Sequence, residues 1–371
     1  MYKYVQRMRE LFDLLEDRLS RDVFLARIQC DIEPSLTNIS KISDLCRGIP
    51  DRKNHAAEWK NMIYKLNQKD EKIVLYGTAV QGHSVAENIL REGMDFYAFV
   101  SRGAERFQNG LLGKPVMTPD WLFENKKCYV IIASSGDNYN QIRENLLHHD
   151  YPEERLLPCY RESLIRADRD QYFVFPDLIK DGAFVDGGCF DGQNSIDFCG
   201  FKGKSQTVFA FEPDAAKIAL CEANMKKAGL SDYRLMEAGL SDAAKTADFM
   251  ENSSGGSYIL SEWNIESRGK RTREIQTVRV DDVVGKHTVG MIKMDIEGSE
   301  LSALHGAERT IVRDQPFLAI SVYHKPGDVL AIMDYCQRIN PGYHFALRHH
   351  GEFCYETAMY ASMDSFPVTG T

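Results

Sequence analysis

The chain has 371 residues, of which 43% are hydrophobic and 27% charged, and its formal net charge is −9. These proportions are those of an ordinary globular protein long enough for two domains, so they exclude a fibrous or disordered chain. The acidic balance argues against nucleic acid as the main partner, because binding a phosphate backbone requires a basic surface.

The sequence shows neither a secretory signal nor a membrane span. Residues 1–19 alternate charged and apolar side chains, and no stretch approaches the ~20 apolar residues that cross a bilayer. The nine cysteines are scattered without a Cys-x-x-Cys pair, which is typical of free thiols in a reducing compartment. We therefore expect a cytoplasmic protein.

Residues 1–69 are predicted to form a helical N-terminal region. One apolar stripe recurs at steps of three and four residues, through Val5, Met8, Phe12, Leu15 and Leu19. The stripe carries no group with obvious chemistry. It favours packing within the chain or association with a second copy of it.

Residues 70–160 alternate short apolar strands with helices. Strands are expected at 72–76, 96–100 and 129–134, with helices after the first and the third. This order predicts a small Rossmann-like α/β domain with a parallel sheet. Because its glycine signature is incomplete, a structural role and the binding of a nucleotide-sugar or glycan both remain open.

Residues 161–371 repeat the α/β pattern, with a mostly parallel seven-stranded sheet. Its strands are expected at 183–186, 207–211, 233–238, 291–295, 317–323, 343–347 and 354–361. Helices are expected at 214–228, 299–312 and 329–339. Residues 245–281 lack helical periodicity and are predicted to form an inserted strand pair or a substrate-side loop, with 253–264 lining the acceptor site.

The strongest local signal is the glycine-rich turn that follows the strand at 183–186. Gly187, Gly188 and Gly192 permit positive φ and a close approach of the backbone to a ligand. Asp186, at the strand end, would repel a pyrophosphate but suits a cation, such as the ammonium of a methionine moiety. A carboxylate would suit the helix N-terminus that follows. The turn therefore favours a ligand with a zwitterionic amino acid end.

Two further acids follow the next strands. Glu212 lies 20 residues after Gly192, the interval at which an acid binds ribose hydroxyls in nucleoside-binding folds. Asp242 follows the third strand, where it either accepts from the exocyclic amine of an adenine or is solvated in a turn. We expect the cofactor-binding residues to lie along this edge of the sheet.

The fourth strand ends at Asp295, and two further acids, Glu297 and Glu300, follow within six residues. Since the carboxyl ends of such strands face the ligand, Asp295 and Glu297 are candidate catalytic residues. Glu300 is in the first turn of a helix, where the helix dipole alone favours an acid. His324, at the end of the fifth strand, fits three roles: proton acceptor, ligand of a divalent metal with Asp295 and Glu297, or an ordinary loop histidine.

These motifs together resemble the FkbM family of methyltransferases. The resemblance covers about residues 180–350 and rests on the runs 186–192, 211–213, 239–242 and 293–300 in that order. It implies a class I Rossmann-like methyltransferase fold and S-adenosylmethionine as the methyl donor. It also implies O-methylation of a sugar, glycan or secondary-metabolite hydroxyl, with a small-molecule or glycan acceptor.

The resemblance assigns roles to individual residues. Asp186, Gly188 and Gly192 would hold the methionine part of the cofactor and Glu212 its ribose, while Asp295 would face the reaction centre with Glu297. Phe190 departs from the family, because many members have asparagine at this position. Two alternatives stay open: an NAD- or nucleotide-sugar-binding enzyme, and a non-catalytic module that binds the cofactor.

Overall fold

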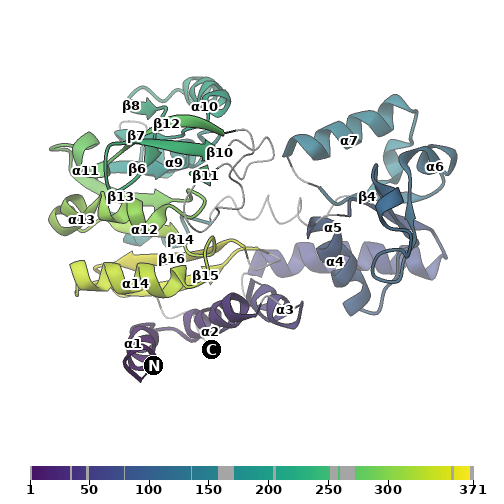
Figure 1. Cartoon of the computed structure of the whole chain (residues 1–371), viewed down its shortest axis with the longest axis horizontal. Helices are drawn as coiled ribbons and strands as arrows, with labels where there is room; N and C mark the ends of the chain where they lie inside the picture. Colours follow the sequence, from purple (N-terminus) through teal and green to yellow (C-terminus); the bar gives the residue numbers. More distant parts are fainter. Residues whose placement is uncertain are drawn as a thin grey trace. The chain divides into compact units, whose positions relative to one another are not determined.

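The computed structural model describes residues 2–33, 36–46, 50–78, 80–134, 136–157, 171–203, 206–250, 258–259, 272–351 and 355–367. The chain divides into two units (Figure 1). The larger unit comprises Met1–Cys46, Arg169–Asn252 and Gly256–Thr371, and the smaller one comprises Arg47–Asp168 and Ser253–Gly255. The helical region expected over 1–69 is therefore divided between the two units.

The smaller unit is a parallel α/β layer. Its strands are β1 (Ile73–Tyr76), β2 (Ala98–Val100), β3 (Val116–Met117), β4 (Tyr129–Ile132) and β5 (Leu156–Leu157), in the sheet order β3-β2-β1-β4-β5. Its main helices are α4 (Pro50–Gln68), α5 (Val80–Arg91), α6 (Pro119–Glu124) and α7 (Gly136–His148). The apolar runs become strands because side chains of β1 and β4 are buried on both faces.

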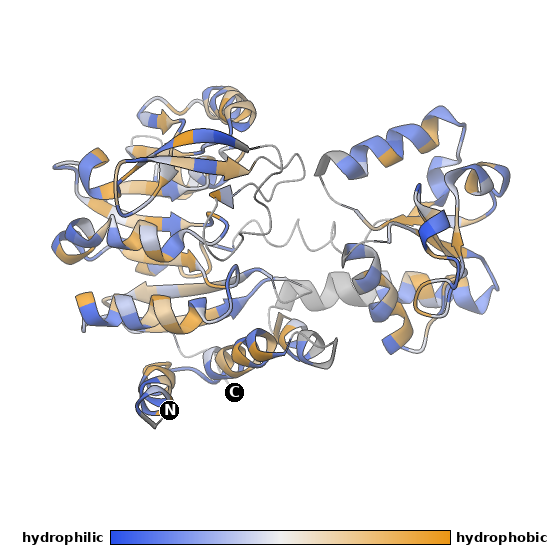
Figure 2. Ribbon diagram, in the orientation of Figure 1, coloured by the Kyte–Doolittle hydropathy of each residue, from blue (hydrophilic) through white to orange (hydrophobic). Residues whose placement is uncertain are grey.

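The larger unit is built on a seven-stranded sheet in the order β15-β16-β14-β13-β6-β7-β8. Its strands are β6 (Ala183–Gly187), β7 (Val208–Phe211), β8 (Tyr233–Met236), β13 (Val289–Met294), β14 (Phe317–Ser321), β15 (His344–His349) and β16 (Thr357–Ser362). All neighbours pair in parallel except β16, which is antiparallel to both β14 and β15. Figure 2 shows hydrophobic residues along much of this sheet.

The helices beside this sheet are α9 (Gln193–Lys202), α10 (Ala215–Lys227), α11 (Val280–Val283), α12 (Glu300–His305), α13 (Glu308–Asp314) and α14 (Asp328–Ile339). The single helix expected at 299–312 is instead two short helices. Between them, a Cβ on Gly306 would lie 2.1 Å from the carbonyl oxygen of Ser241. The Gly306 carbonyl accepts from the amide of Asp281, so it leaves the helical hydrogen-bond ladder.

A second, four-stranded sheet forms in the region expected to hold an inserted strand pair. Its strands are β9 (Gly239–Leu240), β10 (Thr246–Met250), β11 (Tyr258–Ile259) and β12 (Thr272–Val278), in the order β11-β10-β12-β9. The strand expected at 233–238 is β8, which ends at Met236, and β9 begins after it, at Gly239, in the other sheet. Apart from β11, the proposed acceptor loop at 253–264 lies outside the described residues.

The first three helices, α1 (Tyr2–Asp13), α2 (Arg18–Ile32) and α3 (Leu36–Leu45), belong to the larger unit. Leu11, Leu15 and Phe24 are buried in the same core as Phe345 of β15. Of the predicted stripe, Leu15 lies in this core and Met8, Phe12 and Leu19 pack against it, whereas Val5 is 51% exposed. Most of the stripe thus packs within the chain. In the part of the chain that the structure describes, no helix is long and apolar enough to span a membrane.

Candidate functional site

A buried ion pair lies at the carboxyl end of β6. Asp186 is fully buried, and its carboxylate accepts from the hydroxyl of Ser195 at 2.7 Å and from Nζ of Lys293 at 3.1 Å. Lys293 is the register partner of Asp186 on β13, and it also donates to the carbonyls of Gly187 and Gly188, at 3.0 and 2.7 Å. The cation that meets Asp186 is therefore a lysine of the chain, where we had expected the ammonium of a ligand. This pairing makes Asp186 a residue that holds the turn in place.

The glycines of the turn are required by close packing of the backbone. Gly188 has φ +71°, and a Cβ there would lie 2.0 Å from the carbonyl oxygen of Asp295. Gly192 is the left-handed cap before α9, and its Cβ would meet the sulfur of Cys221 at 2.9 Å. A Cβ on Gly187 would lie 2.9 Å from Leu240. The turn after β6 thus lies directly against the end of β13.

Glu212 ties the same turn to the end of β7. Its carboxylate accepts from the backbone N–H of Phe190 at 3.2 Å and from that of Asp214 at 2.9 Å. The side chain is buried, and this burial raises the pKa of Glu212. The acid expected to bind a ribose is therefore at the glycine turn.

Asp242 has different surroundings. It is exposed, and its Oδ1 accepts from the hydroxyls of Ser241 and Ser302 and from Lys245. The hydrogen bond from Ser241 is the main reason that the pKa of Asp242 is below its usual value. The sequence allowed two roles for Asp242, a contact with an adenine and a solvated position in a turn. These contacts fit the second role.

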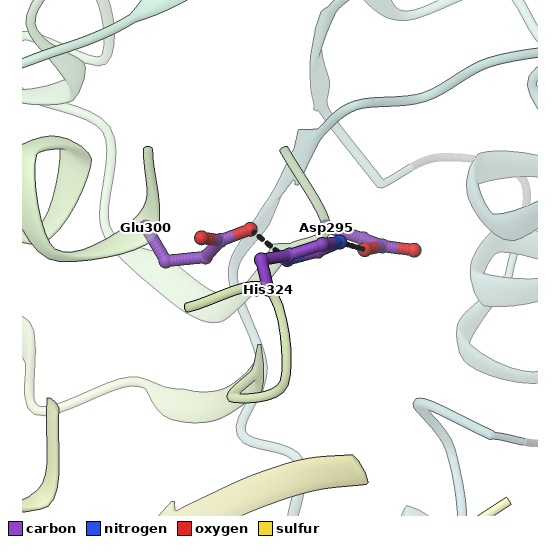
Figure 3. A group of neighbouring side chains, drawn as sticks. All are labelled: Asp295, Glu300 and His324. Atoms are coloured by element: carbon purple, nitrogen blue, oxygen red, sulfur yellow. Dashed lines mark ion pairs between the residues drawn. The ribbon is translucent and has the colours of Figure 1, made fainter. Parts of the chain in front are cut away.

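Three carboxylates surround the imidazole of His324, and Figure 3 shows two of them, those of Glu300 and Asp295. Its Nδ1 lies 3.0 Å from Oε1 of Glu300, and its Nε2 lies 3.4 Å from Oδ1 of Asp295 and 3.5 Å from Oε2 of Glu297. The side chain of His324 is 8% exposed and that of Glu300 is 1% exposed. The structure thus brings the predicted catalytic residues Asp295, Glu297 and His324 together. It adds Glu300 to this group, although the helix dipole alone explains an acid at this position in the sequence.

Two tyrosines, which the sequence did not single out, contact Asp295. The hydroxyl of Tyr172 donates to Oδ2 at 2.8 Å, and that of Tyr323 donates to Oδ1 at 3.3 Å. Tyr172 precedes the first strand expected in this domain, at 183–186, and no spacing or motif there points to the site. Tyr323 directly precedes His324, and that adjacency could have identified it.

The charges of this cluster set its protonation states. Burial lowers the pKa of His324, but Glu300, Asp295 and Glu297 outweigh it and raise that pKa to about 10. Burial alone would raise the pKa of Asp295, but the positive charges of His324 and Lys293 hold it below its usual value. At neutral pH the ring is therefore a cation and Asp295 an anion. Of the two predicted proton acceptors, this favours Asp295, because an imidazolium has no free lone pair.

Burial raises the pKa of Glu297 to about 7 and that of Asp328 to about 6. Asp328 begins α14, and its carboxylate accepts from the amide of Lys325, next to His324. Both acids are thus harder to ionise than free carboxyls. Burial is the main cause for both, and the neighbouring carboxylates add to it.

Replacing Asp328 with asparagine is expected to stabilise the larger unit above pH 6 by roughly 1–3 kcal/mol. The folded pKa lies above the unfolded value of 3.8, so the folded state binds more protons and loses stability as pH rises from about 4 to 6. Asparagine removes that loss and keeps an oxygen for the Lys325 amide. Urea unfolding of both proteins at pH 4 and pH 7.5 measures this difference in stability. Parallel pH profiles of the two proteins would contradict the pKa shift.

Comparisons with known proteins give two family matches. Residues 188–344 match the model of the Methyltransferase FkbM domain, and residues 69–157 match that of the C2185-like N-terminal domain. No curated protein matches.

Among solved structures, a methyltransferase FkbM from Methylobacillus flagellatus KT is 18% identical, with 93% of this chain and 99% of that chain covered and a TM-score of 0.46. A SAM-dependent methyltransferase from Aquifex aeolicus is 13% identical, covering 55% of this chain and 98% of that chain at a TM-score of 0.32. An SAH-bound methyltransferase from Podospora anserina is 11% identical, covering 62% and 89% at 0.29.

Proposed function

The chain carries an FkbM methyltransferase domain at residues 188–344, and on this premise we propose that it transfers a methyl group from S-adenosylmethionine to a hydroxyl of a small acceptor. Acceptors of this kind are sugars, glycans and secondary metabolites. The site that we assign to this reaction is the edge of the larger sheet at which β6, β7 and β13 end.

The observation that carries the proposal is the direct joining of these three strand ends. Gly188 lies against the carbonyl of Asp295, and the amide of Phe190 donates to Glu212. A nucleoside with an amino acid end, held by the glycine turn and Glu212, would therefore lie on the same edge as Asp295. Cofactor and proton acceptor then share one site, as methyl transfer requires.

In the proposed reaction, an acceptor oxygen attacks the methyl carbon of the sulfonium. A carbon–oxygen bond forms as the carbon–sulfur bond breaks, S-adenosylhomocysteine leaves, and the hydroxyl proton passes to Asp295. Tyr172 and Tyr323 hold the Asp295 carboxylate in place through their hydroxyls. The protein mainly supplies alignment and a positioned base.

Titration calorimetry with S-adenosylmethionine, S-adenosylhomocysteine and NAD tests the cofactor and separates this function from the two alternatives. We expect both sulfur ligands to bind and NAD not to bind. If neither sulfur ligand binds at high micromolar concentration, the proposal is wrong. Binding without methyl transfer to any member of a panel of nucleotide-sugars, glycans and small hydroxylated metabolites would favour a non-catalytic module.

Replacing Glu212 with alanine is expected to weaken S-adenosylhomocysteine binding at least tenfold, or about 1.4 kcal/mol. The change removes the acceptor for two backbone amides as well as the proposed ribose contact. Glu212→Gln, which keeps one oxygen acceptor, should lose less. Calorimetry on both variants measures the effect, and an unchanged affinity in Glu212→Ala would contradict the ribose role.

A further inference from the structure

We propose that His324, Asp295 and Glu297 bind one divalent cation, and that Glu300 holds the imidazole in the orientation this requires. Both ring nitrogens of His324, whose side chain is 8% exposed, are buried without a hydrogen bond. Nδ1 has a carboxylate oxygen of Glu300 at 3.0 Å, whereas Nε2 has carboxylate oxygens only at 3.4 Å and beyond. A buried polar atom without a partner is costly, and it marks a place where a ligand or ion is missing.

The distances from Nε2 to the two nearest carboxylate oxygens fit three ligands of one ion better than they fit hydrogen bonds. Nε2 lies 3.4 Å from Oδ1 of Asp295 and 3.5 Å from Oε2 of Glu297. A charge-assisted N–H···O bond spans only ~2.7–2.9 Å. Two ligand atoms that are each ~2.1 Å from a common ion at tetrahedral angles lie ~3.4 Å apart.

Glu300 determines which ring nitrogen of His324 can bind the ion. Ligand-type atoms of Asp295, Glu300 and His324 all lie within 4.8 Å of one another, but Figure 3 shows the ring between the two carboxylates. Nδ1 faces Glu300, whose carboxylate is itself fixed by the amide of Ile296 at 2.8 Å. Metal-binding histidines commonly direct their second nitrogen at such a carboxylate. Nε2 is therefore the ligand atom, on the side that Asp295 and Glu297 face. The ion would take the place of the proton that the imidazolium carries in the ion-free protein.

Charge favours a cation at this point. Three carboxylates face a ring that holds one positive charge at most, and the nearby Lys293 is engaged by Asp186 and two carbonyls. One imidazole with two carboxylates suits a first-row ion such as Mn²⁺ or Zn²⁺. A cation here would lower the pKa of a hydroxyl bound to it. This effect on an acceptor hydroxyl rests on the proposed function. The binding of the ion itself does not.

Mn²⁺ binding by the full chain tests the inference. After treatment with a chelator, the protein is titrated with Mn²⁺ and the free ion is followed by electron paramagnetic resonance. We expect one ion per chain, with His324→Gln and Glu297→Gln each weakening binding at least tenfold. Glu300→Gln should weaken it by about 10- to 100-fold without adding or removing a ligand.

Glu222→Gln serves as the matched control, because Glu222 is an exposed α10 carboxylate paired with Lys226. It should bind Mn²⁺ as the wild type does. Circular dichroism of each variant shows that the fold is kept. If wild type binds no ion, or His324→Gln and Glu297→Gln bind as well as wild type, the inference is overturned.

The two proposals fail separately. A chain that binds S-adenosylhomocysteine but no Mn²⁺ contradicts the cation site and leaves the methyltransferase intact. A chain that binds one Mn²⁺ but neither sulfur ligand supports the cation site and contradicts the methyltransferase.

Discussion

Replacing Lys293 with methionine is expected to destabilise the larger unit by about 3–5 kcal/mol, because it leaves a buried carboxylate without its counter-charge. Asp186 and Lys293 are 0% and 1% exposed. The change also removes the donor from the carbonyls of Gly187 and Gly188, so the glycine turn should loosen. Hydrogen exchange of peptides from β6 and β13 measures the effect in this unit alone.

The double variant Asp186→Asn/Lys293→Met is the control for this prediction. With both charges removed, no uncompensated charge stays buried, so we expect it to be more stable than Lys293→Met alone. The difference from additivity is the interaction energy of the pair. Strictly additive losses would mean that Lys293 stabilises the unit by packing and that its charge is irrelevant.

The sequence predicted well what depends on local pattern. The apolar runs at 183–186 and 291–295 are close to β6 and β13, because strands covered on both faces consist of consecutive apolar residues. The glycine turn and the position of Glu212 beside it also followed from local sequence, whereas the binding of a ribose by Glu212 stays a prediction. Positive φ and the order of strands and helices depend on the types of a few neighbouring residues. They can therefore be predicted without knowing which distant residues are in contact.

What the sequence could not predict depends on register and on distant contacts. A lysine inside an apolar strand is visible at position 293, but its partner follows from the pairing of Lys293 with Asp186 across β13 and β6. Tyr172 reaches Asp295 across more than a hundred residues of chain. Glu300 illustrates the same limit, because its helix position explains an acid there and hides its contact with His324.

Replacing Gly188 with alanine is expected to cost about 2–5 kcal/mol and to abolish cofactor binding, since it opposes both the backbone conformation and the packing of the turn. Its φ of +71° disfavours any side chain, and the new Cβ would lie 2.0 Å from the carbonyl oxygen of Asp295. That carbonyl is backbone and has no rotamer with which to move aside. Relief therefore requires the turn and the end of β13 to separate.

Gly200→Ala is the matched control, because Gly200 lies within α9 and a Cβ there meets nothing within 4 Å. Alanine should be neutral at this position or stabilise the helix by up to about 1 kcal/mol. Urea unfolding and S-adenosylhomocysteine calorimetry on both variants separate the general effect of losing a glycine from the contact at Asp295. If Gly188→Ala folds and binds as Gly200→Ala does, the turn is not packed against Asp295. The shared edge on which we place cofactor and proton acceptor would then be wrong.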